Sequence, residues 1–167
     1  RGFTSLSERM TVEGVVSLLN QYFSLMVDIV FRNDGVLDKF VGDELMAVFG
    51  VIASDRNTPY CNAVKTAIEM QQAAGKLMKT RALLKKEAFE IGIGINTGEA
   101  IVGNVGSANR MDYTVIGDCV NMAARFQQVA EGGEIIIGEK TYQYTKDLFR
   151  IKKKGRIKLK NKSNRVV

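Results

Sequence analysis

The segment 37–45, Leu-Asp-Lys-Phe-Val-Gly-Asp-Glu-Leu, contains the acidic residue with the clearest potential for chemistry. Asp43 follows Gly42, and a carboxylate beside a glycine can approach a hydrated metal ion with little steric hindrance. Mg²⁺ takes one or two protein carboxylates and completes its shell with water and phosphate oxygens. Gly-Asp is also ordinary turn chemistry, so this segment alone leaves a metal-binding hairpin and a plain turn both open.

A second polar pair lies in the segment 114–125, Thr-Val-Ile-Gly-Asp-Cys-Val-Asn-Met-Ala-Ala-Arg. Asn121 and Arg125 are four residues apart, so they share one face of a helix that begins near Gly117. A neighbouring amide and guanidinium can bind a sugar oxygen and a phosphate. A solvated helix face shows the same spacing, and the pair taken alone favours that plainer interpretation.

Glycines are frequent in the middle of the chain, at Gly92, Gly94, Gly98, Gly103 and Gly106. Glycine within strands usually marks a bulge or the close approach of another backbone. The two glycines at 92 and 94 lack the strand-to-helix context of a dinucleotide fingerprint, and no GxxxxGK[ST] phosphate loop is present. Five scattered aspartates are interpreted as surface residues: Asp28, Asp34, Asp38, Asp55 and Asp112.

Composition excludes several kinds of site. The chain has 167 residues, no histidine and two cysteines. The absence of histidine rules out Ser-His-Asp and Cys-His catalysis and any imidazole metal site within the chain. Two cysteines cannot build a disulfide framework or a four-sulfur zinc site. A metal site must therefore use oxygen ligands, which suit Mg²⁺, Mn²⁺ or Ca²⁺.

The net charge of +6 arises at the end of the chain. Residues 150–167 include nine basic and no acidic residues, whereas residues 1–149 include 15 basic and 18 acidic ones. A basic tail can bind nucleic acid, but Phe149 alone supplies no aromatic stacking pattern, so we expect no nucleic-acid partner. We also expect no membrane span, because no apolar run reaches the ~18 residues that one needs.

Apolar spacing predicts helices over 11–31, from Pro59 towards Leu84, over 117–130 and near 139–146. The helix over 117–130 should turn Val120, Ala123, Ala124 and Val129 inward. Alternation and turn signals predict strands over 36–41, 44–50, 89–95, 100–105, 112–116 and 134–137, with basic strands from 148 onward. This order predicts an α+β fold, or an α/β sandwich, with helices packed on a mostly antiparallel sheet.

Four segments in this order resemble the catalytic domain of class III nucleotidyl cyclases, and the resemblance covers essentially the whole chain. They are the opening Arg-Gly-Phe-Thr-Ser-Leu-Ser-Glu, the Asp-Lys-Phe-Val-Gly-Asp hairpin, the Gly-Ile-Asn-Thr-Gly-Glu-Ala turn, and the run 113–118 followed by Val-Asn-Met-Ala-Ala-Arg. Each segment alone is weak, but four at the spacing of the family are a specific signal.

The resemblance implies a ferredoxin-like α+β fold of the polymerase-palm type and a homodimer, as in bacterial adenylyl cyclases, with active sites between two chains. It implies two ions of Mg²⁺ or Mn²⁺ per site, which activate the ribose 3′-hydroxyl for attack on the α-phosphate of ATP. Positioning and charge neutralisation dominate such phosphoryl transfer, so no histidine is required. Residues 1–167 are then one catalytic domain, whose first strand and first metal-binding aspartate are expected before residue 1.

Residue by residue, the resemblance assigns Asp43 to the second metal-binding aspartate of the family. Phe3 and Thr4 match a loop whose backbone amides hold the phosphates. Asn121 matches the residue that orients the ribose, and Arg125 matches the one that stabilises charge at the reacting phosphate. The lysine that binds the triphosphate is matched loosely, by Lys160 or by its neighbours Lys158 and Lys162.

Lys39 and Thr114 match the pair that reads the purine, and their chemistry favours ATP over GTP. Lysine can donate to N1 of adenine, and the threonine hydroxyl can accept from the 6-amino group. Guanine reverses both positions, which would leave buried polar groups unpaired. In the family, Lys39 and Asp43 serve different active sites, because each site mixes residues from both chains.

Three alternatives remain at this point. Residues 41–45, Val-Gly-Asp-Glu-Leu, look somewhat like the Gly-Gly-Asp-Glu-Phe hairpin of diguanylate cyclases, although Val41 and Leu45 depart from it. A guanylyl cyclase is the second alternative, and a catalytically silent dimerisation or regulatory module is the third. We further expect a cytoplasmic catalytic domain joined to regulatory or sensor domains in a larger signalling protein.

Overall fold

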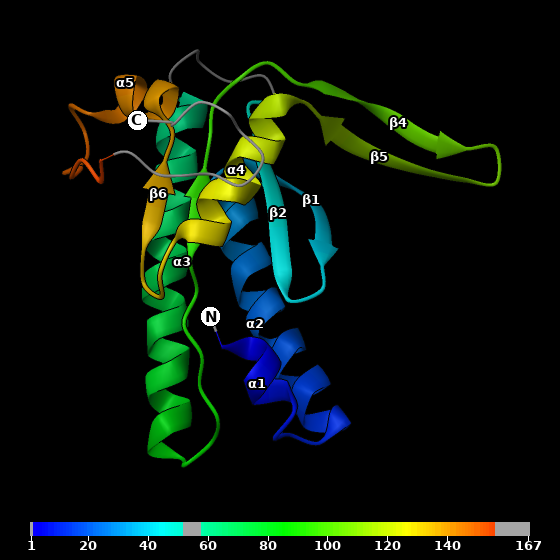
Figure 1. Cartoon of the computed structure of the whole chain (residues 1–167), viewed down its shortest axis with the longest axis vertical. Coiled ribbons are helices and arrows are strands. Elements are labelled where there is room, and N and C mark those ends of the chain that lie inside the picture. Colours follow the sequence, from blue (N-terminus) through cyan, green and yellow to red (C-terminus); the bar gives the residue numbers. More distant parts are fainter. Residues whose placement is uncertain (1, 52–57, 156–167) are drawn as a thin grey trace.

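The computed structural model describes residues 2–51 and 58–155 (Figure 1). Five helices and six strands are found there: α1 (Phe3–Ser7), α2 (Val12–Arg32), β1 (Gly35–Val41), β2 (Glu44–Phe49), α3 (Thr58–Leu83), β3 (Ile93–Ile95), β4 (Ile101–Ser107), β5 (Arg110–Ile116), α4 (Asp118–Val129), β6 (Ile135–Ile137) and α5 (Glu139–Thr145). The mixture of helices with mainly antiparallel strand pairs confirms the predicted α+β class.

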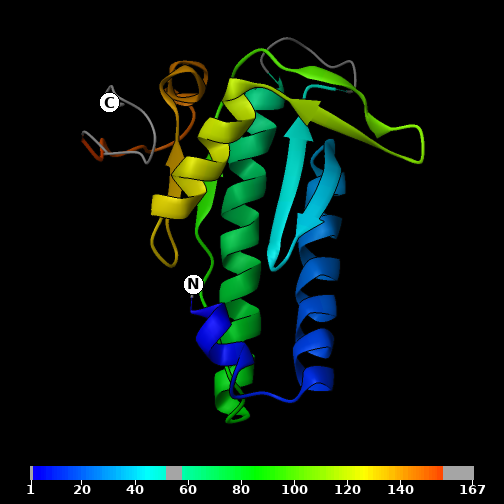
Figure 2. The same cartoon turned by 45° about the vertical axis from the view of Figure 1, so that its right-hand side comes forward.

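The long helices α2 and α3 lie side by side behind the β1–β2 hairpin (Figure 2). Thr11 caps α2 by accepting a hydrogen bond from the Gly14 amide at 3.2 Å, which satisfies one of the free donors at a helix start. The side chains that α2 buries are spaced three and four residues apart, as the sequence predicts: Leu18, Tyr22, Met26, Ile29 and Val30. Together with residues of α3 they form the main hydrophobic core.

Helix α2 also has the length and composition of a membrane span. It contains 21 residues and includes an 18-residue window with a mean hydropathy of 1.5, although its apolar residues form no uninterrupted run of that length. The core helix of a soluble protein passes the same test, and α2 does place five apolar and aromatic side chains in the core. Only 28% of the apolar window of α2 is buried inside the fold, so packing accounts for part of its apolar character.

The strands form three separate pairs. β1 and β2 make the predicted antiparallel hairpin, and β4 and β5 make a second one that projects from the body as a long arm (Figure 1). β3 pairs in parallel with β6, a partnership that the sequence did not predict, and β3 is shorter than the expected strand over 89–95. Residues 148–155 contain no strand, and the rest of the predicted basic strands lies outside the described residues.

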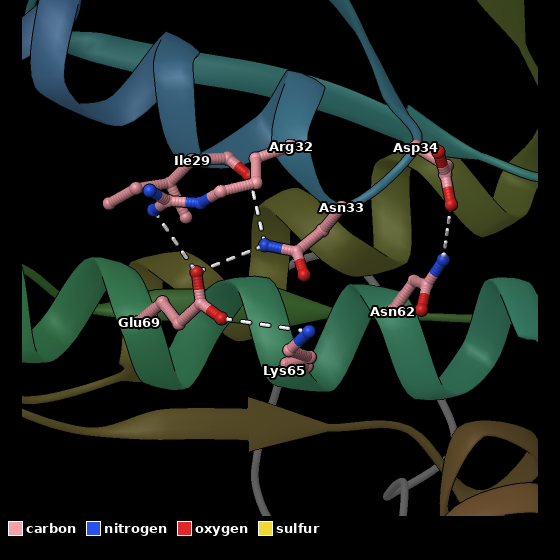
Figure 3. Close-up of polar contacts among 7 residues, drawn as sticks. All are labelled: Ile29, Arg32, Asn33, Asp34, Asn62, Lys65 and Glu69. Carbon is pink, nitrogen blue, oxygen red and sulfur yellow. Dashed lines mark hydrogen bonds and ion pairs between the residues drawn. The ribbon is translucent and has the colours of Figure 1, made fainter.

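A cluster of polar residues holds the connection between the end of α2 and the start of β1 (Figure 3). The buried Asn33 amide donates to the Ile29 carbonyl at 3.0 Å and to the Glu69 carboxylate of α3 at 3.1 Å. Arg32 reaches the same carboxylate at 3.3 Å. Because the hairpin begins two residues later, these contacts hold its base against α3.

Helix α4 is held against β3 by backbone contact. A Cβ atom on Gly94 would overlap the backbone of Ala123 and Gln127, so only glycine lets strand and helix approach this closely. The Asn96 amide donates to the Cys119 carbonyl at 3.1 Å and fixes the start of α4. The predicted role of these glycines is confirmed at Gly94, but a Cβ on Gly103 would meet nothing.

This contact yields a stability prediction. Gly94→Ala should lower the free energy of unfolding by about 1–3 kcal/mol, because the new methyl group forces β3 and α4 apart. Gly103→Ala is the matched control and should change it by less than about 0.5 kcal/mol. Chemical denaturation of the two variants measures both values. Equal stability of the two variants would contradict the packing described for Gly94.

Candidate active site

The turn of the β1–β2 hairpin places Asp43 on the wall of a cleft of about 990 Å³. Gly42 adopts φ 62°, a left-handed conformation that suits glycine and leaves Asp43 exposed at the turn. Residues of α1, α2, α3, α4, β2 and β3 line most of the rest of the cleft. Both β2 and β3 line the cleft. In the part of the chain that the structure describes, β2 pairs only with β1 and β3 pairs only with β6, so each strand has one unpaired edge.

Phe3 and Thr4 line the same cleft, but they form the first turn of α1 instead of the expected loop. Gly2 starts this short helix with φ 75°, and the Phe3 ring packs edge-on against Phe89 with centroids 5.8 Å apart. Amides in the first turn of a helix have no acceptor within the helix. The prediction that these backbone amides are available for phosphate oxygens is therefore compatible with the helical geometry.

Tyr22 also lines this cleft, a role that the sequence analysis did not assign to it. Its ring is buried and packs against Phe89 and Phe23. Burial and the nearby Asp43 carboxylate raise the pKa of Tyr22 to about 12. Burial is the larger of the two causes, and the negative charge of Asp43 adds to it.

Asp43 satisfies the requirements of a divalent ion in part. Mg²⁺ and Mn²⁺ prefer oxygen ligands and use few protein carboxylates when phosphate oxygens complete the shell. Among residues 2–51 and 58–155, no three acidic or sulfur ligands gather around one point. The donor set thus fits an ion shared with a bound triphosphate better than an ion held in a cage of protein ligands.

The second group of residues lies where β1 contacts β5. The Thr114 hydroxyl donates to Asp38 Oδ2 at 3.0 Å, and Lys39 Nζ lies 3.5 Å from the same oxygen. The Asp38 side chain is only 4% exposed. The expectation that Asp38 is a surface residue was therefore wrong, and Asp38 joins the two predicted purine-reading residues.

A bulge in β1 makes this arrangement possible. Leu37 pairs with Ala47 and Lys39 pairs with Met46, so Asp38 is an extra residue without a partner in β2. In a regular strand adjacent side chains point to opposite faces, and a bulge locally changes that alternation. Asp38 and Lys39 can therefore meet although they are adjacent in sequence.

Asn121 and Arg125 lie one turn apart on α4, as the spacing predicts. Asn121 is exposed, whereas Arg125 is half-buried and its Nη1 atom is buried without a hydrogen-bond partner among the described residues. A buried guanidinium nitrogen without an acceptor is costly. Arg125 is therefore suited to an anionic ligand. Ala124, expected to face inward, is exposed, and Met122 and Phe126 form the buried face instead.

The structure thus sorts the predicted residues into two groups. Asp43, Phe3 and Thr4 line the cleft, whereas the Lys39–Thr114 pair lies outside its walls. Asn121 and Arg125 are likewise not among the cleft residues, although other residues of α4 are. Lys160, with its alternatives Lys158 and Lys162, lies outside the described residues. Within one chain the two groups do not form a single pocket.

Comparison with known proteins gives a consistent result. The family described as "Adenylate and Guanylate cyclase catalytic domain" matches residues 1–167. An adenylate cyclase of Anabaena cylindrica is 38% identical over 145 residues, which are 83% of this chain and 28% of that protein. A terminal-differentiation-specific adenylate cyclase of Dictyostelium discoideum is 39% identical over 131 residues, 78% of this chain and 6% of that protein. The chain thus spans less than a third of either relative.

Solved structures agree on the fold. The adenylyl cyclase CyaB from P. aeruginosa superposes with a TM-score of 0.94 at 39% identity, covering 99% of this chain and 86% of that one. The guanylyl cyclase Cya2 superposes with a TM-score of 0.91 at 36% identity, covering 99% and 84%. Overall similarity therefore does not distinguish the two nucleotides, and the choice rests on side chains.

The raised pKa of Tyr22 predicts a specific loss of stability in alkali. Between pH 10 and about 12 the unfolded chain loses the phenolic proton before the folded chain does, so the free energy of unfolding falls as pH rises. The loss due to this group should reach about 3 kcal/mol, and Tyr22→Phe should abolish it. Asp43→Asn should reduce this loss only in part, because the substitution removes the charge but leaves Tyr22 buried. Chemical denaturation between pH 9 and 12 measures the free energy of unfolding. If this free energy falls equally steeply with pH in the wild type and in Tyr22→Phe, the prediction is contradicted.

Proposed function

The chain belongs to the family of adenylate and guanylate cyclase catalytic domains, and from this premise we propose that it converts ATP to 3′,5′-cyclic AMP and pyrophosphate. One observation carries the choice of ATP. Lys39 and Thr114, far apart in sequence, meet through Asp38 at the β1–β5 contact. This places a cationic donor and a hydroxyl acceptor together, as N1 and the 6-amino group of adenine require.

The reaction needs the ribose 3′-hydroxyl to attack the α-phosphorus while pyrophosphate leaves. Asp43 would hold Mg²⁺ or Mn²⁺, two ions per site as the resemblance implies; bound metal lowers the pKa of the hydroxyl and neutralises phosphate charge. The Phe3 and Thr4 amides bind phosphate oxygens at the start of α1. Asn121 orients the ribose, and Arg125 stabilises the charge that develops on the reacting phosphate.

We propose that the active form is a homodimer with each site shared between two chains. The cleft group of one protomer then faces the purine and α4 groups of its partner, which explains why one chain does not join them. The projecting β4–β5 arm supports this proposal because it exposes apolar residues that a monomer would leave in water: Ile101, Val105, Met111, Tyr113 and Ile116.

Membership of this family also supports three proposals about the surroundings of the domain: a preceding strand, attached domains and a cellular location. A strand with the first metal-binding aspartate of the family, N-terminal to residue 1, would suit the unpaired edges of β2 and β3, which both line the cleft. Regulatory or sensor domains accord with the greater length of the relatives. We propose a cytoplasmic location for the catalytic domain, where ATP is available.

A guanylyl cyclase is the second candidate, because Cya2 is 36% identical to this chain. Guanine presents an acceptor at its 6-position and a donor at N1, so it would place a donor against the ammonium group of Lys39. An unpaired buried polar group costs about 1–3 kcal/mol. The purine-reading pair therefore argues for ATP even though the fold does not.

Arg125 provides the first test of the proposed mechanism. In a Mn²⁺-dependent assay of cyclic AMP and pyrophosphate formed from ATP, Arg125→Ala should lower kcat by about 10²–10³-fold, with a smaller change in KM, because its charge acts mainly in the transition state. Gln128→Ala, on the exposed face of the same helix, is the control and should retain wild-type kinetics. Unchanged turnover in Arg125→Ala would remove Arg125 from the mechanism.

Lys39 provides the second test, directed at the base. Lys39→Glu should reduce the preference for ATP over GTP by at least about tenfold, since a carboxylate accepts from N1 of guanine and has no donor for N1 of adenine. Lys79→Glu makes the same change of charge on exposed α3 and should leave the preference intact. The readout is the ratio of kcat/KM for the two nucleotides. If the ratio is the same in both variants, Lys39 does not read the base.

A further inference from the structure

We propose that Asp38 determines purine specificity as a positioning residue, by fixing the direction of the Thr114 hydroxyl and the location of the Lys39 ammonium group. The inference rests on the proposed function, since it concerns how the site distinguishes adenine from a 6-oxopurine. It adds a residue that the resemblance left unassigned and that the sequence pattern placed on the surface.

Asp38 contacts both of the purine-reading residues, Lys39 and Thr114. One carboxylate oxygen, Oδ2, is 3.0 Å from the Thr114 hydroxyl and 3.5 Å from Lys39 Nζ. The Asp38 side chain is 4% exposed and Thr114 is 7% exposed, whereas the Lys39 side chain is 41% exposed. Asp38 thus lies behind the two residues that a base would contact, and water competes little for its oxygen.

The direction of the hydrogen bond is fixed by chemistry. A carboxylate can only accept, so the Thr114 hydroxyl must donate its single proton to Asp38. What remains on the hydroxyl oxygen is acceptor capacity alone. Thr114 can then accept from the 6-amino group of adenine but cannot donate to the 6-oxygen of inosine or guanine. A threonine without this carboxylate could rotate its hydroxyl and serve either base.

Asp38 acts on Lys39 through charge. Lysine is a flexible cation with three donors, and a contact with Asp38 leaves two of them free. Because the side chain is partly exposed, it could otherwise extend into solvent at little cost. The carboxylate therefore keeps the ammonium group beside Thr114, where it can donate to N1 of adenine. Both effects of Asp38 favour the same base.

The bulge in β1 supports this role. Asp38 is the residue that has no partner in β2, between the pairs Leu37–Ala47 and Lys39–Met46. Bulges commonly re-aim a side chain next to a functional site. Here the bulge directs a carboxylate towards β5, where it meets Thr114.

Asp38→Asn tests the inference, because an amide nearly equal in size can donate to the Thr114 oxygen and release the hydroxyl proton. ATP and ITP are the probes, since they differ only at the 6-position and in the proton on N1. The ratio of kcat/KM for ATP over ITP should fall at least about tenfold in Asp38→Asn. Asp34→Asn is the matched control, the same chemical change at the start of the same hairpin, and should keep the wild-type ratio.

A second pair of variants separates hydroxyl orientation from a general effect on structure. In a Thr114→Val background the hydroxyl is gone, so adding Asp38→Asn should change the ATP/ITP ratio much less than it does in the wild type. Thermal unfolding identifies variants that do not fold. If Asp38→Asn does not fold, Asp38→Ser, whose hydroxyl can also donate, replaces it in the same comparison.

These outcomes test the role of Asp38 separately from the proposed function. A wild-type protein that prefers ATP, with the same ATP/ITP ratio in folded Asp38→Asn or Asp38→Ser, overturns the role of Asp38 and leaves the proposed function standing. An equal fall in the ratio with and without the Thr114 hydroxyl overturns the proposed orientation of that hydroxyl, because only the action of Asp38 on Lys39 could then account for the fall. A wild-type protein that prefers GTP or ITP overturns the proposed function, and the inference with it.

Discussion

The hydrogen bond from Thr114 to Asp38 is the interaction on which the organisation of the site depends. It crosses from the β1–β2 hairpin to the β4–β5 arm and joins two residues that are separated by 76 positions in sequence. The hairpin is held at its base by Asn33 and Glu69 and beside the arm by Asp38. Asp43, at the other end of the same strand pair, is thereby set at a defined place relative to β5 and to the start of α4.

The two groups of site residues have different chemistry, and this difference suits the proposed phosphoryl transfer, for which no histidine is required. The cleft presents a carboxylate and the amides of a helix start, which suit metal ions and phosphates. The other group presents an ammonium, a hydroxyl, an amide and a guanidinium, which suit a base, a ribose and a charged transition state. Each function is electrostatic or directional, so neither group needs a side chain that exchanges protons near neutral pH.

Much of the fold could be predicted from local pattern. The period of apolar residues located α2 and α3, and Gly42 with Asp43 located the hairpin, because these signals act over a few residues. The parallel pairing of β3 with β6 could not be predicted, since it joins segments about forty positions apart and leaves no local mark. Asp38 was misplaced for a related reason: strand alternation cannot reveal a bulge. Phe3 and Thr4 were assigned to a loop because the motif alone does not show the short helix that Gly2 starts.

The central claim is that this domain cyclises ATP in preference to GTP, and it is tested most directly by competition. The protein is supplied with equal concentrations of ATP and GTP and with Mn²⁺ in one reaction, and the cyclic products are separated and quantified over the initial phase. Under competition the product ratio equals the ratio of the two kcat/KM values. We expect cyclic AMP to exceed cyclic GMP by at least about tenfold, the effect of about 1.4 kcal/mol from mismatched polar groups. An excess of cyclic GMP, or a cyclic dinucleotide as the main product, would contradict the claim.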